Sequence, residues 1–339
     1  MGWRTGIVAG VWALSAAGSG EAATFGVKDW VGVCDNTRVC AAFGFSPVEA
    51  EEVSYLKLER GGEPQAAARI TLSSRDLAKG SWRVAVDGKV VPGLEAVRAQ
   101  GQGEGEVVSA PLSTAQSAAL TAAIRNGQQL ELAQGGKRGA ISLAGSAATL
   151  RWLDDQQRRA GTTTALLATG PKAASATPPA PPLVRAAPPA SQARLPKAPP
   201  QAVKARLGEC DDDIDSLGIE PIVARLSTGV ILWAVACSRG AYNVVYDLVL
   251  ADETGAKVRP LALAGMGPEP ASDLMNVEFD PKTQTLSNFD KARGLGDCGG
   301  MNEWVWDGRA FQATHQTLMP ECRGVTPEDW PVDFRTRSR

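Results

Sequence analysis

The residue types that most often carry enzymatic chemistry are scarce in this sequence. The 339-residue chain has one histidine, His315, so only one imidazole is available to activate a serine or cysteine nucleophile. Two serines in glycine contexts, Ser46 and Ser146, do not lie in the Gly-x-Ser-x-Gly pattern of a nucleophile elbow. His315 itself lies in an alternating run that is typical of a strand face. We therefore expect a protein that is not an enzyme, because no catalytic set is recognisable.

An acidic run offers a second kind of chemistry, the binding of calcium. The sequence DDDID at 211–215 places carboxylates at alternate positions, which suits Ca²⁺. However, the sixth position of the run is Ser216, where a calcium loop needs glycine, and the twelfth is Ile222, where it needs glutamate. The run is more typical of a solvated acidic turn. We predict no metal site and no cofactor.

A glycine-rich segment, RGLGDCGG at 293–300, offers a third kind of chemistry, the binding of an anion. Its backbone amides can form an anion-binding nest, with Lys291 and Arg293 supplying positive charge. The segment lacks the Gly-Lys-Ser/Thr ending of a nucleotide loop. Its glycines are also what a tight turn with positive φ requires. A tight turn is the favoured interpretation, and binding of a small anion is the alternative.

Two tryptophans follow this segment on one face of a predicted strand. Trp304 and Trp306 share that face because side chains alternate along a strand. Clustered tryptophans stack on sugars or fill a partner's pocket, although more often they belong to a core. A hydrolase that uses only carboxylates, Asp297 with Glu303, is a further alternative, since carboxylate pairs cleave glycosides. The candidate binding residues are Arg239, Tyr242, Asn243, Lys291, Arg293, Asp297, Glu303, Trp304 and Trp306.

The N-terminal residues have the three-part pattern of a secretory signal. Arg4 precedes an apolar stretch at 7–17 that is too short to span a bilayer, and small residues flank Glu21 at the cleavage positions. We expect cleavage near Ala22. The first cysteine, Cys34, lies well past this point, so no lipid anchor is expected there. The mature protein is predicted to be soluble, not membrane-spanning, and periplasmic or secreted.

Six cysteines support export to an oxidising compartment, because an even count behind a signal sequence predicts three disulfides. No Cys-x-x-Cys motif occurs, which argues against zinc or redox chemistry. The N-terminal half has only Cys34 and Cys40, so we expect these two to pair across a hairpin. The other four allow three connectivities, of which sequence proximity favours Cys210–Cys237 and Cys298–Cys322.

Composition divides the chain. Residues 170–200 are dominated by proline and alanine, which cannot build a core. We predict a signal peptide (1–22), an N-terminal β-rich domain (24–168), a disordered Pro/Ala-rich linker (169–204) and a C-terminal disulfide-bonded β domain (205–339). The chain has 35 basic and 37 acidic residues and no basic stripe, so we expect no nucleic-acid partner.

Strands dominate both domains. Alternating patterns and turn residues predict strands at 29–33, 40–45, 54–59, 67–72, 82–86, 89–91, 129–133 and 138–143 in the N-terminal domain. In the C-terminal domain they predict strands at 222–225, 229–237, 243–251, 258–263, 278–280, 285–289, 303–307 and 311–317. The fold class is therefore mainly β, with two domains of the sandwich or meander type.

One or two helices are expected in the N-terminal domain. Ser113 and Gln116 form a capping box before a helix that stops at 126–127, where the sequence is Asn-Gly. A second helix is predicted at 146–158. Leu150 and Leu153 should form its buried face. Its polar face should carry Asp154, Asp155 and Arg158.

Several motifs together resemble the bacterial domain-of-unknown-function family 1176. They are FGVKDWVGVCDNTRVC at 25–40, ISLAG at 141–145 with DDQ at 154–156, CSRGAYN at 237–243, and KARGLGDCG at 291–299 with EWVWDG at 303–308. The resemblance covers nearly all of the mature chain. The N-terminal domain is also similar to the exported invasion-associated locus B proteins. Both resemblances imply export and a β-rich fold, and neither implies a known reaction.

These observations lead to one functional prediction with two alternatives. We expect a non-catalytic envelope protein whose partner is another envelope protein or a cell-wall component. The first alternative is a binding module for a small anion or glycan at 291–306. The second is the carboxylate-dependent hydrolase.

Overall fold

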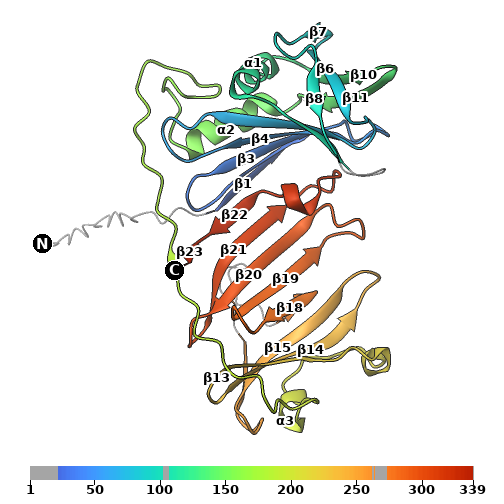
Figure 1. Cartoon of the computed structure of the whole chain (residues 1–339), viewed down its shortest axis with the longest axis vertical. Helices are drawn as coiled ribbons and strands as arrows, with labels where there is room; N and C mark the ends of the chain where they lie inside the picture. Colours follow the sequence, from blue (N-terminus) through green and yellow to red (C-terminus); the bar gives the residue numbers. More distant parts are fainter. Residues whose placement is uncertain (1–21, 102–106, 262, 264–272, 339) are drawn as a thin grey trace, which may run out of the picture.

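The computed structural model describes residues 22–101, 107–261, 263 and 273–338. The predicted signal peptide lies almost entirely outside them. The protein is mainly β, as the sequence predicts, and its sheets are stacked along the long axis of the molecule (Figure 1). No helix in the described ranges has the length and apolar character needed to cross a bilayer.

A six-stranded antiparallel sheet is the base of the N-terminal domain. Its order is β1 (Ala23–Val27), β2 (Trp30–Cys34), β3 (Cys40–Phe45), β4 (Ser54–Arg60), β5 (Ala68–Ser74) and β9 (Val108–Pro111). A smaller sheet contains β6 (Gly80–Val86), β7 (Lys89–Val90), β8 (Val97–Ala99), β10 (Gln129–Gln134) and β11 (Lys137–Ser142). The two sheets and the helices α1 (Thr114–Ile124) and α2 (Ser146–Gln156) enclose one apolar core.

Local signals set the ends of these elements. Asp87 and Gly88 both have positive φ, which matches the twist of the β6–β7 hairpin. The capping box of Ser113 and Gln116 is present at the start of α1. Helix α2 differs from the prediction, because it ends at Gln156 and Asp154 is fully buried rather than on a polar face. The Asp154 carboxylate accepts three backbone N–H bonds and pairs with Arg60, which makes its burial possible.

Two further sheets form the C-terminal domain. One contains β13 (Ile222–Ser227), β14 (Val230–Arg239), β15 (Val244–Ala251), β16 (Val258–Pro260) and β17 (Asp273–Met275). The other has the order β18 (Val277–Asp280), β19 (Thr285–Lys291), β20 (Gly299–Trp306), β21 (Phe311–Met319) and β22 (Val332–Arg335). Their facing sides share a core of leucine, tryptophan and phenylalanine side chains. Short 3₁₀ turns occur at Ile214–Leu217 and Pro327–Asp329.

The two domains pack directly against each other. Every residue of β2 and β3 is buried, although only one face of the six-stranded sheet faces the N-terminal core. The other face carries Val31, Phe43 and Phe45, which pack with Met319 and Trp330 of the C-terminal domain. An apolar contact of this kind holds the six-stranded sheet on the β18–β22 sheet.

The Pro/Ala-rich segment differs from the disordered linker expected from its composition. Its first residues contact the N-terminal domain, where Lys172 bridges Thr162 and the Thr177 carbonyl accepts from Arg38. It then runs along the C-terminal domain, where β12 (Leu183–Val184) pairs with β23 (Arg337–Ser338) and a short helix, α3, spans Gln201–Lys204 (Figure 1). Val203 is fully buried in a cluster with Trp233 on the outer face of the β13–β17 sheet. We call residues 169–204 the strap. Its position is favourable because it removes the apolar outer face of β14 and β15 from water.

All three predicted disulfides are confirmed. Cys34 and Cys40 pair across the β2–β3 hairpin, in which they are also register partners. The C-terminal bridges are Cys210–Cys237 and Cys298–Cys322.

Candidate functional site

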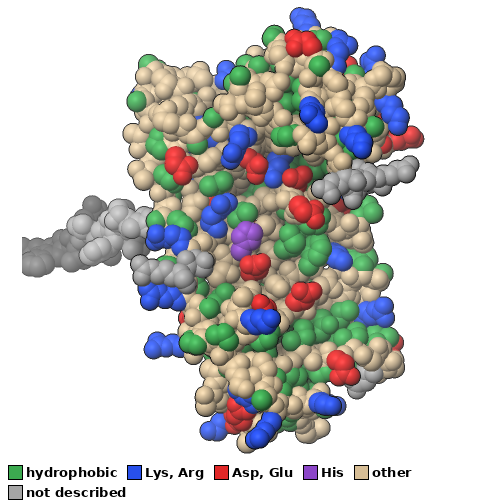
Figure 2. Space-filling view, viewed as in Figure 1, with side chains coloured by type: hydrophobic (Ala, Val, Ile, Leu, Met, Phe, Trp, Pro, Cys, Tyr) green, Lys and Arg blue, Asp and Glu red, His purple; other side chains and the backbone are tan. Residues whose placement is uncertain are grey.

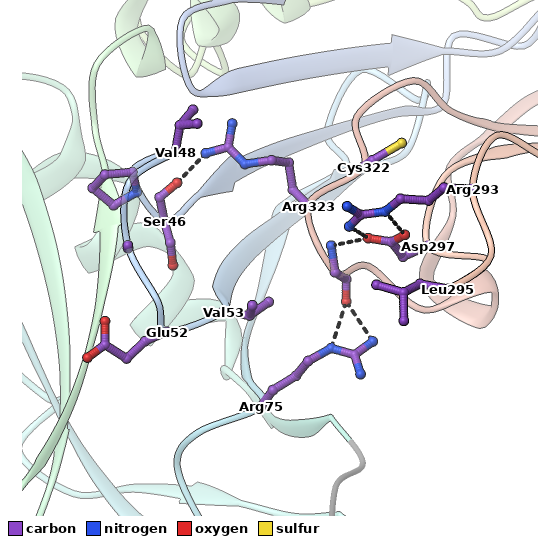
Figure 3. Close-up of a pocket in the computed structure, with 13 residues that line it drawn as sticks. Ser46, Val48, Glu52, Val53, Arg75, Arg293, Leu295, Asp297, Cys322 and Arg323 are labelled. Atoms are coloured by element: carbon purple, nitrogen blue, oxygen red, sulfur yellow. Dashed lines mark hydrogen bonds and ion pairs between the residues drawn. The ribbon is translucent and has the colours of Figure 1, made fainter.

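A pocket of about 320 Å³ opens between the two domains (Figure 3). The loop at 46–53, between β3 and β4, forms its N-terminal wall. The opposite wall comes from the loops at 293–297 and 322–324, which the Cys298–Cys322 disulfide ties together. Gly299 has a φ of 131°, and a Cβ there would overlap the Asp290 carbonyl, so only glycine fits. The glycine-rich segment therefore forms the tight turn that the sequence favours.

Asp297 is the most constrained side chain of the pocket. Only 1% of it is exposed, and its carboxylate accepts bonds from Arg293 Nε at 2.7 Å and from the Gly324 N–H at 2.7 Å. Burial raises the pKa of this carboxyl, but the bonds from Arg293 and Gly324 outweigh burial and leave the pKa below its usual value. Asp297 is therefore ionised and fully bonded, which suits a structural role.

Two more arginines join the domains around the pocket. Arg75 donates from Nε and Nη2 to the Gly324 carbonyl, at 3.4 and 3.1 Å. Arg323 pairs with Asp29 at 3.3 Å and also donates to the Ser46 carbonyl across the boundary (Figure 3). These contacts fix the walls of the pocket relative to each other.

The mouth of the pocket is open and carries two large apolar side chains as well as the exposed Glu52. Val48 is 72% exposed on the N-terminal wall, and Leu295 is 79% exposed on the C-terminal wall. These two side chains, one from each domain, give both walls of the pocket an apolar contact surface. The arrangement suits a ligand that combines an apolar group with a negative charge, because the arginines lie deeper in the pocket.

Comparison with known proteins gives a family and no activity. A family model described as "Protein of unknown function (DUF1176)" matches residues 24–337. The chain belongs to this family. It is 28% identical over 350 residues to the uncharacterized protein YpfG of Escherichia coli (strain K12), covering 91% of this chain and 92% of that protein. No solved structure matches.

Of the predicted site residues of this DUF1176 protein, Arg293 and Asp297 line the pocket, and Tyr242, Asn243 and Lys291 lie beside it. Tyr242 donates to the Ala292 carbonyl at 3.3 Å, and Asn243 donates to the Lys291 carbonyl at 2.9 Å, so both brace the loop that carries Arg293. The Lys291 ammonium lies 5.1 Å from the Phe289 ring. These side chains position the loop rather than line the pocket.

The remaining predicted residues lie elsewhere. Trp304 and Trp306 are 0% and 1% exposed between the two C-terminal sheets, so they belong to the core and offer no stacking surface. Alternation placed both tryptophans on the inner face of β20, where the facing sheet covers them. Glu303 points to the opposite face and lines a different pocket, with His315. Arg239 ends β14, and its backbone N–H donates to Asp211 at 3.2 Å.

The sequence did not identify Val48, Arg75 or Arg323. Each lies in a loop without a motif, and packing of the domains brings Arg323 of the C-terminal domain to the pocket that Val48 and Arg75 of the N-terminal domain also line. The acidic run at 211–215 forms a turn instead of a calcium loop, with Asp211 bonded to Cys237 and Arg239. One described cluster has metal-ligand spacing, Cys210 and Cys237 with Asp247, but its two sulfurs are joined in a disulfide.

Proposed function

We propose that this DUF1176 protein is an exported, non-catalytic binding protein of the bacterial envelope whose partner contacts the pocket between its two domains. The observation that carries the proposal concerns two apolar side chains at the mouth of that pocket. Val48 from the N-terminal domain and Leu295 from the C-terminal domain are each more than two-thirds exposed. Two such side chains that come from different domains and border one pocket give a partner an apolar contact on both walls.

Export is supported by two independent features. Three disulfides with no free cysteine among the described residues are typical of a protein that folds outside the cytoplasm. The N-terminal residues have the pattern of a secretory signal.

A non-catalytic role is supported by the placement of the carboxylate pair that the sequence suggested and by the pKa of Asp297. A carboxylate-dependent hydrolase needs one carboxyl group that holds a proton, and the pKa of Asp297 is lowered. Asp297 and Glu303, the pair that the sequence suggested for this reaction, line different pockets.

The chemistry of the pocket favours a protein segment over a free anion. Arg293 and Arg323 already pair with Asp297 and Asp29, so a small anion would gain little net charge attraction. A segment with an apolar side chain beside a carboxylate would contact Val48 and Leu295 and use the remaining guanidinium N–H groups. We therefore place the envelope partner of the proposal here, with the anion-binding module as the second candidate.

Site-specific photo-crosslinking in intact cells tests the proposal. A photo-reactive residue at Leu295 should crosslink to one envelope protein, and the same residue at Leu217, which is 38% exposed far from the pocket, should not. Leu295→Asp should then weaken binding of the purified partner at least tenfold, while Leu217→Asp should leave it unchanged. Equal crosslinking at both positions, or none at Leu295, would contradict the proposal.

A further inference from the structure

The β18–β22 sheet has an open, polar area on the face that points toward the N-terminal domain. Near the domain boundary this face is apolar and covered, with Met319 and Met301 in the interdomain cluster. Farther along the same strands the face carries Glu303 and His315 and is not covered by that domain. Figure 2 shows the side chain of the single histidine at the surface near the middle of the molecule.

This open area forms a groove of about 660 Å³, twice the volume of the pocket between the domains. The strap supplies one wall, and its position is fixed by the bond from the Ala187 N–H to the Trp306 carbonyl at 2.7 Å. Side chains with hydroxyl or charged groups line most of the remaining surface of the groove. The lining residues are Val184, Ala186, Thr283, Thr285, Glu303, Val305, Thr314, His315, Arg335 and Thr336.

Three functional groups converge in the groove from neighbouring strands. Glu303 on β20 is the register partner of His315 on β21, which is in turn the partner of Arg335 on β22. Directly opposed side chains lie on the same face, with Cβ atoms about 4.5–5.5 Å apart. The row therefore presents an acceptor, an imidazole and a guanidinium within reach of one ligand.

Arg335 is held in place by the N-terminal domain. Its guanidinium pairs with the buried Asp35 carboxylate, and its backbone N–H and C=O both bond to the Asn36 side chain at 2.9 Å. Glu303 is exposed and forms no ion pair with any described residue. The groove thus offers a fixed donor and a free acceptor, which is the arrangement of a preorganised binding site.

We propose that this groove binds a saccharide. Vicinal hydroxyl groups donate to a carboxylate such as Glu303 and accept from guanidinium and imidazole N–H groups, while the threonine hydroxyls serve either need. Val184, Ala186 and Val305 offer a small aliphatic surface for the C–H face of a sugar ring. One acid and one arginine leave the lining without strong net charge, which suits a ligand rich in hydroxyls better than a polyanion.

Binding of a defined sugar to the full chain tests this proposal. Isothermal titration with chitotriose, and separately with the disaccharide of N-acetylglucosamine and N-acetylmuramic acid, should give saturable binding to at least one. Glu303→Gln and His315→Gln should each weaken that binding at least tenfold. Circular dichroism checks that the variants are folded.

Glu278→Gln is the matched control. Glu278 lies in the same cross-strand row, opposite Ser287, which is opposite Glu303, but it does not line the groove. Its replacement should leave the affinity unchanged, as should Leu295→Asp at the pocket between the domains. Absence of binding to both sugars, or equal affinity in Glu303→Gln and Glu278→Gln, would overturn the proposal without affecting the proposed protein partner.

Discussion

Replacement of Asp297 by asparagine should destabilise the two loops that form the C-terminal wall of the pocket. The amide keeps the shape of the carboxylate but removes its charge. The wild-type carboxylate accepts from Arg293 and from the Gly324 N–H, so one amide oxygen cannot satisfy every donor. The amide NH₂ of asparagine must then face another donor, in a position that is 1% exposed.

The size of the effect follows from burial. Removing one partner of a buried ion pair costs about 3–5 kcal/mol. The Arg293 side chain is 43% exposed, however, so water can take over part of its solvation. We therefore expect Asp297→Asn to lower the free energy of unfolding by about 2–3 kcal/mol at pH 7.

Urea unfolding at several pH values is the measurement. The folded-state pKa of Asp297 lies below its ordinary value of 3.8, so its contribution is complete above that value and is lost as the pH falls through the folded-state pKa. The wild-type advantage over Asp297→Asn should therefore shrink at acid pH. Asp212→Asn, in the exposed acidic turn, is the control. A loss of less than about 0.5 kcal/mol in Asp297→Asn would refute the reasoning.

Three further predictions concern two buried residues, Asp154 and Val203, and the half-buried Asp333. Asp154→Ala should lower the free energy of unfolding, measured in urea, by about 3–5 kcal/mol, because it leaves Arg60 buried without its partner. Replacement of the exposed neighbour, Asp155→Ala, should lower it by less than about 0.5 kcal/mol. Asp333→Asn should raise the melting temperature at pH 7. Burial raises the pKa of Asp333, so its charged form opposes folding, and this gain should vanish when calorimetry is repeated below that pKa. Val203→Asp should release the strap and speed tryptic cleavage within it, while Ala202→Asp, at the exposed preceding residue, should not; equal cleavage rates would argue against a docked strap.

The sequence predicted the features that depend on near neighbours. The strands, the hairpin at Asp87 and the capping box at Ser113 each rest on a pattern of a few residues. The disulfide pairing followed from proximity along the chain. The mainly β class is confirmed for the same reason, since alternation is a local property.

The features that the sequence did not predict depend on contacts between distant parts of the chain, in which one segment buries the apolar face of another. Strand β14 has apolar residues on both faces, with Leu232 and Ala234 toward the C-terminal core and Ile231 and Trp233 toward the strap. Continuous apolar runs of this kind indicate burial on both sides, as they do in β2 and β3. This signal was present in the sequence, but it does not identify the cover. Proline and alanine content alone suggested disorder for the strap, although Val203 and Leu195 anchor it.

The packing of the domains connects both proposed sites. The pocket at Leu295 exists only where the two domains meet, and the groove depends on Asp35 of the N-terminal domain to fix Arg335. A ligand at either site therefore contacts or depends on both halves, and its binding should stabilise their contact by mass action. A hinged pair of domains on a free tether would separate these residues. The docked strap and the interdomain core oppose such motion, so each site is expected to be preformed before its ligand arrives.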